Sequence, residues 1–239
     1  MESSQMHYLP LAPAFFAMLA GIFLIVVVLV QIRVLRYAYM SLGISSRTAL
    51  LLLTASLIGS YINIPVAHLP ERVSQAGREV SFFGIHYVVP VVVQWPGTVI
   101  AVNVGGAIIP GLLSLYLLVK HDLWIRGIIA TAIIAAIVNV LATPVEGVGI
   151  AVPIFVPPIA TAIVALLLAR HHAAPLAYVS GSLGTLIGAD LLNLGAVQGL
   201  GAPVASIGGA GTFDGIFVTA ILAVLLASIW PWRRRTEPV

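Results

Sequence analysis

Apolar residues gather in long runs along the chain, and short segments between the runs carry most of the charge. A helix needs about 20 residues to cross the hydrocarbon of a bilayer. Runs near that length lie at residues 10–35, 48–67, 98–119, 124–142, 149–170, 175–196 and 210–231. The pattern therefore predicts an all-α membrane protein of about seven transmembrane helices, forming a single integral membrane domain over residues 1–239.

Residues 80–97, with the sequence VSFFGIHYVVPVVVQWPG, interrupt this helical pattern between the second and third runs. Valine and aromatic residues dominate the stretch, which is typical of β-strands. Gly84, Pro90 and Pro96 make a continuous helix unfavourable. We expect a short β-hairpin here, outside the membrane.

Composition supports a lipid environment and excludes several classes of function. The chain is 60% hydrophobic and 8% charged, so membrane lipids are expected partners. Its net charge of +3 is too small and scattered for a nucleic-acid surface. The chain has no cysteine, and its six histidines form no HExxH or similar pair, so we expect no metal site and no cofactor. No pattern in the sequence indicates an oligomeric state.

The basic residues fall mainly on one side of the predicted spans. Only Arg72 and Arg78 lie on the other side, and that side also holds the N-terminus. Because Lys and Arg concentrate in cytoplasmic loops, we expect the N-terminus outside and the C-terminus in the cytoplasm. The residues on the predicted cytoplasmic side are Arg33, Arg36, Arg47, Lys120, Arg126, Arg170, Arg233, Arg234 and Arg235.

Two aspartates lie inside the last two apolar runs, where a carboxylate costs roughly 3 kcal/mol on insertion scales. Asp190 lies near the end of the sixth run and Asp214 near the start of the seventh. A short loop joins these runs, so we expect antiparallel helices with both carboxylates at similar depth. Two close carboxylates share a proton and can act as an acid–base dyad. Each aspartate taken by itself could instead cap a helix or extend its side chain toward water.

Small and polar residues accompany the two aspartates. Glycines recur three and four residues apart before Asp190, and others precede Asp214, which allows close backbone approach and flexibility. Plain helix packing is the alternative explanation. Asn103 lies in the third run beside glycines, where broken helices can line a cavity. We expect the residues of a substrate-binding site to be Gly188, Gly209, Gly211 and Asn103.

Residues 209–222, GAGTFDGIFVTAIL, resemble the Gly-x-Gly-Asp segment of intramembrane aspartyl proteases of the presenilin and signal-peptide-peptidase type. By this resemblance Asp214 is the motif aspartate and Asp190 its partner. The resemblance implies hydrolysis of transmembrane or signal-peptide substrates. Thr212 and Phe213 lengthen the motif, Ala189 stands where that family usually has tyrosine, and no Pro-Ala-Leu tripeptide occurs.

The chain as a whole also resembles uncharacterised bacterial and archaeal membrane proteins, which implies a prokaryotic cell membrane. The same paired carboxylates would also suit a proton-coupled transporter or channel. An inward-facing Glu146 would favour that alternative, because it would add a third carboxylate to the membrane interior.

Overall fold

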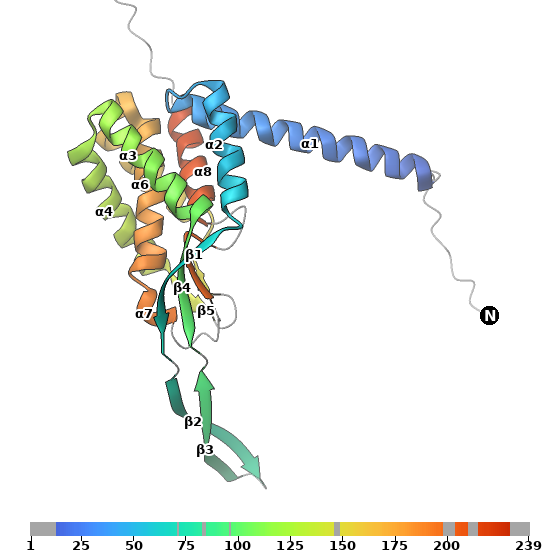
Figure 1. Ribbon diagram of the computed structural model, residues 1–239, viewed down its shortest axis with the longest axis vertical. Helices are drawn as coiled ribbons and strands as arrows, with labels where there is room; N and C mark the ends of the chain where they lie inside the picture. The colour runs from blue at the N-terminus through green and yellow to red at the C-terminus, as the bar shows by residue number, and fades with distance from the viewer. Residues whose placement is uncertain are drawn as a thin grey trace, which may run out of the picture.

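The computed structural model describes residues 13–70, 72–82, 85–95, 97–145, 149–197, 204–209 and 215–229. These residues form a helical bundle from which a long β-hairpin projects at one end (Figure 1). The α-helices are α1 (Pro13–Ser41), α2 (Ser46–Gly59), α3 (Ile109–His121), α4 (Trp124–Leu141), α5 (Val156–Leu168), α6 (Ala173–Thr185), α7 (Leu194–Val197) and α8 (Gly215–Ile229).

Three shorter helical segments of other types continue or connect these helices. The π-helix η1 (Val104–Ile108) leads into α3, and the π-helix η3 (Leu186–Leu191) continues α6. A 3-10 turn, η2 (Arg170–His172), connects α5 to α6. The strands are β1 (Asn63–Leu69), β2 (Arg72–Phe82), β3 (Ile85–Trp95), β4 (Thr98–Asn103), β5 (Thr143–Val145), β6 (Gly149–Ala151) and β7 (Val204–Ile207).

The helices are apolar enough for an integral membrane protein. Within the described residues, Gly21–Ser41, Val104–His121 and Trp124–Leu141 are long enough to cross a membrane. Three shorter helices, Ser46–Gly59, Val156–Leu168 and Gly215–Ile229, are also apolar. The structure thus agrees with a helical membrane protein, while the number of seven spans stays a prediction.

Several predicted helices begin or end as strands, so the all-α prediction was incomplete. The predicted helix at 48–67 stops at Gly59 and continues as β1, and the one at 98–119 begins as β4. In the run at 149–170, α5 begins only at Val156, after β6. The sequence of β4 is TVIAVN, rich in β-branched residues. Apolar runs of this kind suit a buried strand as well as a helix.

The predicted hairpin at residues 80–97 is confirmed and is longer than expected. Strands β2 and β3 pair antiparallel from Arg72 and Trp95 to Phe82 and Ile85, so the first strand begins eight residues before Val80. A second, three-stranded sheet has the order β1-β4-β7, with β4 antiparallel to β1 and parallel to β7. This second sheet, which the sequence did not predict, lies between the bundle and the hairpin (Figure 1).

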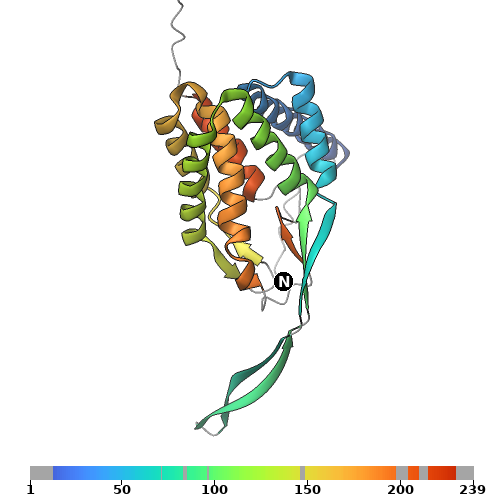
Figure 2. The same ribbon diagram turned by 60° about the vertical axis from the view of Figure 1, so that its left-hand side comes forward.

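Helix α6 is the central helix of the bundle, and α3, α4, α5 and α8 pack around it (Figure 2). Eleven of its thirteen residues are buried. Glycine lets the neighbouring helices come close. A Cβ added to Gly181 would lie 3.1 Å from Ala220 Cα of α8, and one added to Gly184 would lie 2.7 Å from Ile134 Cγ2 of α4. These glycines therefore serve close helix packing.

Three turns meet at the bundle end opposite the hairpin. Lys120 Nζ at the end of α3 donates a 2.7 Å hydrogen bond to Gly43 O in the turn between α1 and α2. The rings of His121 and His172 lie 5.1 Å apart between their centroids, which joins the α3–α4 turn to the α5–α6 turn. We call this region the basic end, after its residues Arg47, Lys120, Arg126 and Arg170.

The tight contact between η3 and α4 yields a test of this packing. A Cβ at Gly188 would lie 2.5 Å from the backbone oxygen of Ala135, so Gly188→Ala should lower stability by about 1–3 kcal/mol through overpacking. Gly111→Ala on α3 is the matched control, because no atom lies within 4 Å of its added Cβ. Thermal unfolding in detergent measures both. Equal melting temperatures for the two variants would contradict the close approach.

Candidate functional site

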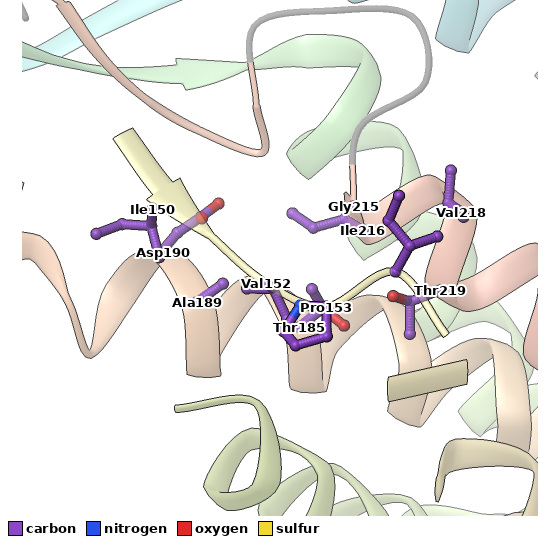
Figure 3. A pocket seen from close by; sticks show the side chains of 11 residues that line it. Ile150, Val152, Pro153, Thr185, Ala189, Asp190, Gly215, Ile216, Val218 and Thr219 are labelled. Atoms are coloured by element: carbon purple, nitrogen blue, oxygen red, sulfur yellow. The ribbon is translucent and has the colours of Figure 1, made fainter. Parts of the chain in front are cut away.

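A cavity of about 280 Å³ lies at the end of α6 nearer the sheets. Three segments line it, and Figure 3 shows their side chains around the space. Strand β6 and the residues after it supply an apolar wall, the end of α6 and η3 supply Thr185 and the carboxylate of Asp190, and the first turns of α8 close the other side. The lining residues are Ile150, Val152, Pro153, Ile154, Thr185, Ala189, Asp190, Gly215, Ile216, Val218 and Thr219.

Asp190 reaches this cavity from a widened helical segment. In η3 the helix takes π-type hydrogen bonds, which release backbone groups from the regular α-helical pattern. The carbonyl oxygen of Gly188 accepts side-chain amide hydrogen bonds from Asn193 Nδ2 at 2.8 Å and Asn139 Nδ2 at 3.3 Å. These two amides stabilise the irregular turn that carries Asp190. π-Helical turns within α-helices frequently occur at functional sites.

The carboxylate of Asp190 is held by the turn that follows β7. The backbone N–H of Gly208 donates a hydrogen bond to Asp190 Oδ2 at 2.7 Å. Gly208 has a φ of +94°, a backbone conformation that favours glycine, and an added Cβ would lie 2.6 Å from the backbone nitrogen of Ala107. Glycine is therefore required for the turn to pass between η1 and Asp190.

Asn103 lies at the junction of β4 and η1. Its side chain is 1% exposed, and its Nδ2 donates to Ser60 O at 2.7 Å and Asn63 Oδ1 at 3.1 Å. Its Oδ1 accepts from the N–H of Gly106 at 2.8 Å. Asn103 is absent from the residues that line the cavity. The structure thus gives it the role of holding the strand-to-helix junction, and its expected contact with substrate stays a prediction.

The other predicted site residues divide between the described and the undescribed parts of the chain. Gly188 packs on α4 and is not among the cavity-lining residues, whereas Gly209 lies in the turn beside Gly208 and its oxygen accepts from Ser206 Oγ at 2.7 Å. Gly211 and Asp214 lie outside the described residues. The predicted Asp190–Asp214 pairing is consequently untested by the structure.

Two threonines contribute hydroxyl groups that the sequence analysis missed. Thr185 and Thr219 line the cavity and are 2% and 4% exposed. Within the described part of the chain, the Thr185 Oγ1 atom has no hydrogen-bond partner. Threonines in helices usually bond to a carbonyl one turn earlier, so their presence in an apolar run gave no signal. Thr185 therefore contributes a buried hydroxyl without a partner in the described residues to the same cavity that Asp190 lines.

The cavity combines one carboxylate and two hydroxyl-bearing residues with mostly apolar walls (Figure 3). Across the described ranges, no group of three or more His, Asp or Glu residues is placed to hold a metal ion. A carboxylate in such surroundings can exchange protons and hydrogen-bond to a peptide group. Hydrolysis of a peptide bond by Asp190 would need a second acid or base. In the sequence, Asp214 directly precedes the cavity residue Gly215.

Comparison with known proteins identifies a family without giving an activity. The family model described as "Protein of unknown function (DUF1614)" matches residues 57–226, which include Asp190, Asp214 and the whole cavity wall. Neither the curated proteins nor the solved structures contain a match to the chain.

Thr185→Val tests the unpartnered hydroxyl. The two side chains have similar shape, and no hydrogen bond is lost, so the free energy of unfolding should stay equal or rise by up to about 1 kcal/mol. Ser182→Ala is the comparison, because Ser182 Oγ bonds to Ser114 Oγ at 2.9 Å and to Tyr178 O at 2.7 Å. It should lower stability by about 1 kcal/mol. Unfolding in detergent measures both, and a clear loss for Thr185→Val would reveal a structural partner.

Proposed function

We propose that this chain, which belongs to the family described as Protein of unknown function (DUF1614), is an intramembrane aspartyl protease-like hydrolase. Its substrates are peptide bonds of transmembrane or signal-peptide segments, and its catalytic residues are Asp190 and Asp214. The observation that carries the proposal is the cavity, which Asp190 lines from η3 and Gly215 lines from α8.

The peptide bond between Asp214 and Gly215 supports the pairing. Gly215 forms part of the cavity wall, and Asp214 is the residue directly before it in the sequence. Helices α6 and α8 also pack directly on one another. In the proposed site, the two carboxylates face the same space and share one proton, because two close carboxylates cannot both ionise.

The proposed reaction is hydrolysis of a peptide bond by water. The ionised carboxylate takes a proton from water, and the oxygen of that water forms a bond to the peptide carbonyl carbon. The protonated carboxylate donates to the peptide, the C–N bond breaks, and the nitrogen leaves as an amine. In this scheme Thr185 supplies a hydrogen bond to a substrate carbonyl, since the residue lines the cavity and its buried hydroxyl has no partner within the described residues.

A substrate helix must unwind before its backbone can reach the carboxylates. Strand β7 ends at Ile207, directly before the turn that holds Asp190, and β7 is an edge strand of the three-stranded sheet. An edge strand can pair with an extended peptide through main-chain hydrogen bonds. We assign β7 as the docking edge for the unwound substrate, and we keep Gly209 and Gly211 as proposed substrate-binding residues.

The proposed setting is a bacterial or archaeal cell membrane with the basic end in the cytoplasm. Short loops rich in Lys and Arg favour the cytoplasmic side. The hydrogen bond from Lys120 to Gly43 joins the end of α3 to the turn between α1 and α2 at this end of the bundle. The N-terminus and the β2–β3 hairpin then lie outside the cell. The site at Asp190 lies in the half of the bundle nearer the outside, because η3 is at the α6 end that faces the sheets (Figure 1).

Cleavage of single-span peptides in liposomes tests the proposal. Asp190→Asn and Asp214→Asn should each lower the cleavage rate by at least about 100-fold, the low end of what acid–base catalysis contributes. Because asparagine has nearly the shape of aspartate, both variants should still fold. Asparagine cannot share the proton, so the activity should be lost. A transition-state-mimicking inhibitor of aspartyl proteases should block the wild type.

The matched control is Asp122→Asn, which removes the same charge at the basic end, in the turn after α3. It should cleave at the wild-type rate. Cleavage that survives both site substitutions would contradict the proposal. If no peptide is cleaved but proton flux across the same liposomes depends on Asp190 and Asp214, the carboxylates serve transport instead.

A further inference from the structure

Helices α2 and α3 form a V whose narrow end lies at the sheet. There, Ser56 Oγ donates to Gly105 O at 2.7 Å, and a Cβ added to Gly59 would lie 3.0 Å from the nitrogen of Gly105. Toward the basic end the two helices diverge (Figures 1 and 2). The contact at one end and the separation at the other leave a groove along the side of the bundle.

This groove has a volume of about 560 Å³, and we call it the α2–α3 groove. Its walls are largely apolar, and Leu112 and Tyr116 on its α3 side are 62% and 49% exposed. Polar groups occur at its basic end, in the turn before α2 and in the first turn of α2. The lining residues are Gly43, Ile44, Ser45, Thr48, Leu52, Ile109, Leu112, Leu113 and Tyr116.

A positive charge lies at the basic end of the groove. Lys120 Nζ bonds to the oxygen of Gly43 and lies 5.3 Å from the ring centroid of Tyr116, so two groove residues hold the ammonium group in place. Lys120 is exposed, and so is Arg47 in the first turn of α2. Asp122, two residues further along, forms no ion pair with Lys120 in the described structure. The charge is therefore available to an anion from outside the chain.

We infer that the α2–α3 groove binds one anionic phospholipid. Its acyl chain lies along the apolar walls, and its phosphate lies against Lys120 and Arg47, near the hydroxyl pair of Ser45 and Thr48, which are 2.8 Å apart. An apolar groove alone would accept the tail of any lipid in a bilayer. The fixed ammonium group at its end selects for a negative headgroup, as basic sites between membrane helices do.

Lys120→Gln tests the inference in the full-length protein. Glutamine keeps a donor for the Gly43 carbonyl but removes the charge. The protein is reconstituted in nanodiscs with equal amounts of phosphatidylglycerol and phosphatidylcholine, and the lipids retained after release into mild detergent are counted by native mass spectrometry. Wild type should retain phosphatidylglycerol preferentially. Lys120→Gln should reduce this preference about five-fold, the factor expected for one basic residue near a membrane surface.

Arg170→Gln is the control, because it removes a like charge from the basic end without touching the groove. It should keep the wild-type preference. Leu112→Trp, which fills the groove, should reduce the retained lipid of both headgroups while leaving the melting temperature near that of the wild type, because Leu112 is mostly exposed. An unchanged preference in Lys120→Gln would overturn the inference. So would an equal loss in Arg170→Gln, or a protein dimer that occupies the groove in place of lipid.

Discussion

The bilayer offers no water to backbone groups, so every interruption of a membrane helix must be satisfied within the chain. This constraint explains the side-chain amides at the two π-helices. Where η1 begins, Asn103 accepts from Gly106 N and donates to Ser60 O. Where η3 begins, the free carbonyl of Gly188 accepts from Asn139 and Asn193. Each irregular segment thus has its own side-chain amides.

The same interruptions produce the candidate site. A regular α-helix would pair all its backbone N–H and C=O groups within itself. In the π-helix η3, Asp190 instead lines a cavity and accepts a hydrogen bond from the Gly208 N–H. The turn at Gly208 in turn depends on its positive φ and on its contact with Ala107 at η1. The irregular backbone at η1 and η3 therefore fixes the position of the Asp190 carboxylate relative to the end of strand β7. The catalytic role that we propose for Asp190 needs such a rigid support.

Part of this arrangement could be predicted from the sequence. Gly84, Pro90 and Pro96 amid valines indicated the hairpin. The aspartate in an apolar run singled out Asp190, which lines the cavity, while its function stays a prediction. The strand-to-helix junctions could not be predicted, because β4 and the start of α3 form one continuous apolar run, and periodicity does not separate a short buried strand from a helix. β7 was missed for a different reason, since it has only four residues and lies between the sixth and seventh predicted spans.

The role of individual polar residues depended on contacts that sequence spacing does not encode. The hydrogen bonds of Asn103 go to Ser60, Asn63 and Gly106 and hold the strand-to-helix junction, while its expected contact with a substrate stays a prediction. Thr185 was overlooked, although it lines the cavity and its hydroxyl has no partner within the described residues. Asn103 ends β4 directly before η1, and Thr185 ends α6 directly before η3. The regular spacing of a strand or an α-helix does not continue into a π-helix, so sequence spacing did not predict the contacts at these junctions.

The central claim is that Asp190 and Asp214 face one cavity, and cysteine cross-linking tests it most directly. The chain contains no cysteine, so Asp190→Cys combined with Asp214→Cys introduces the only two thiols. A short reagent that joins two thiols should cross-link this pair in membranes, as seen by the mass of the joined peptides. The pair Asp190→Cys and Asp122→Cys, at opposite ends of the bundle, should give no product. Absence of the cross-link between positions 190 and 214, with both thiols reactive singly, would contradict the paired site.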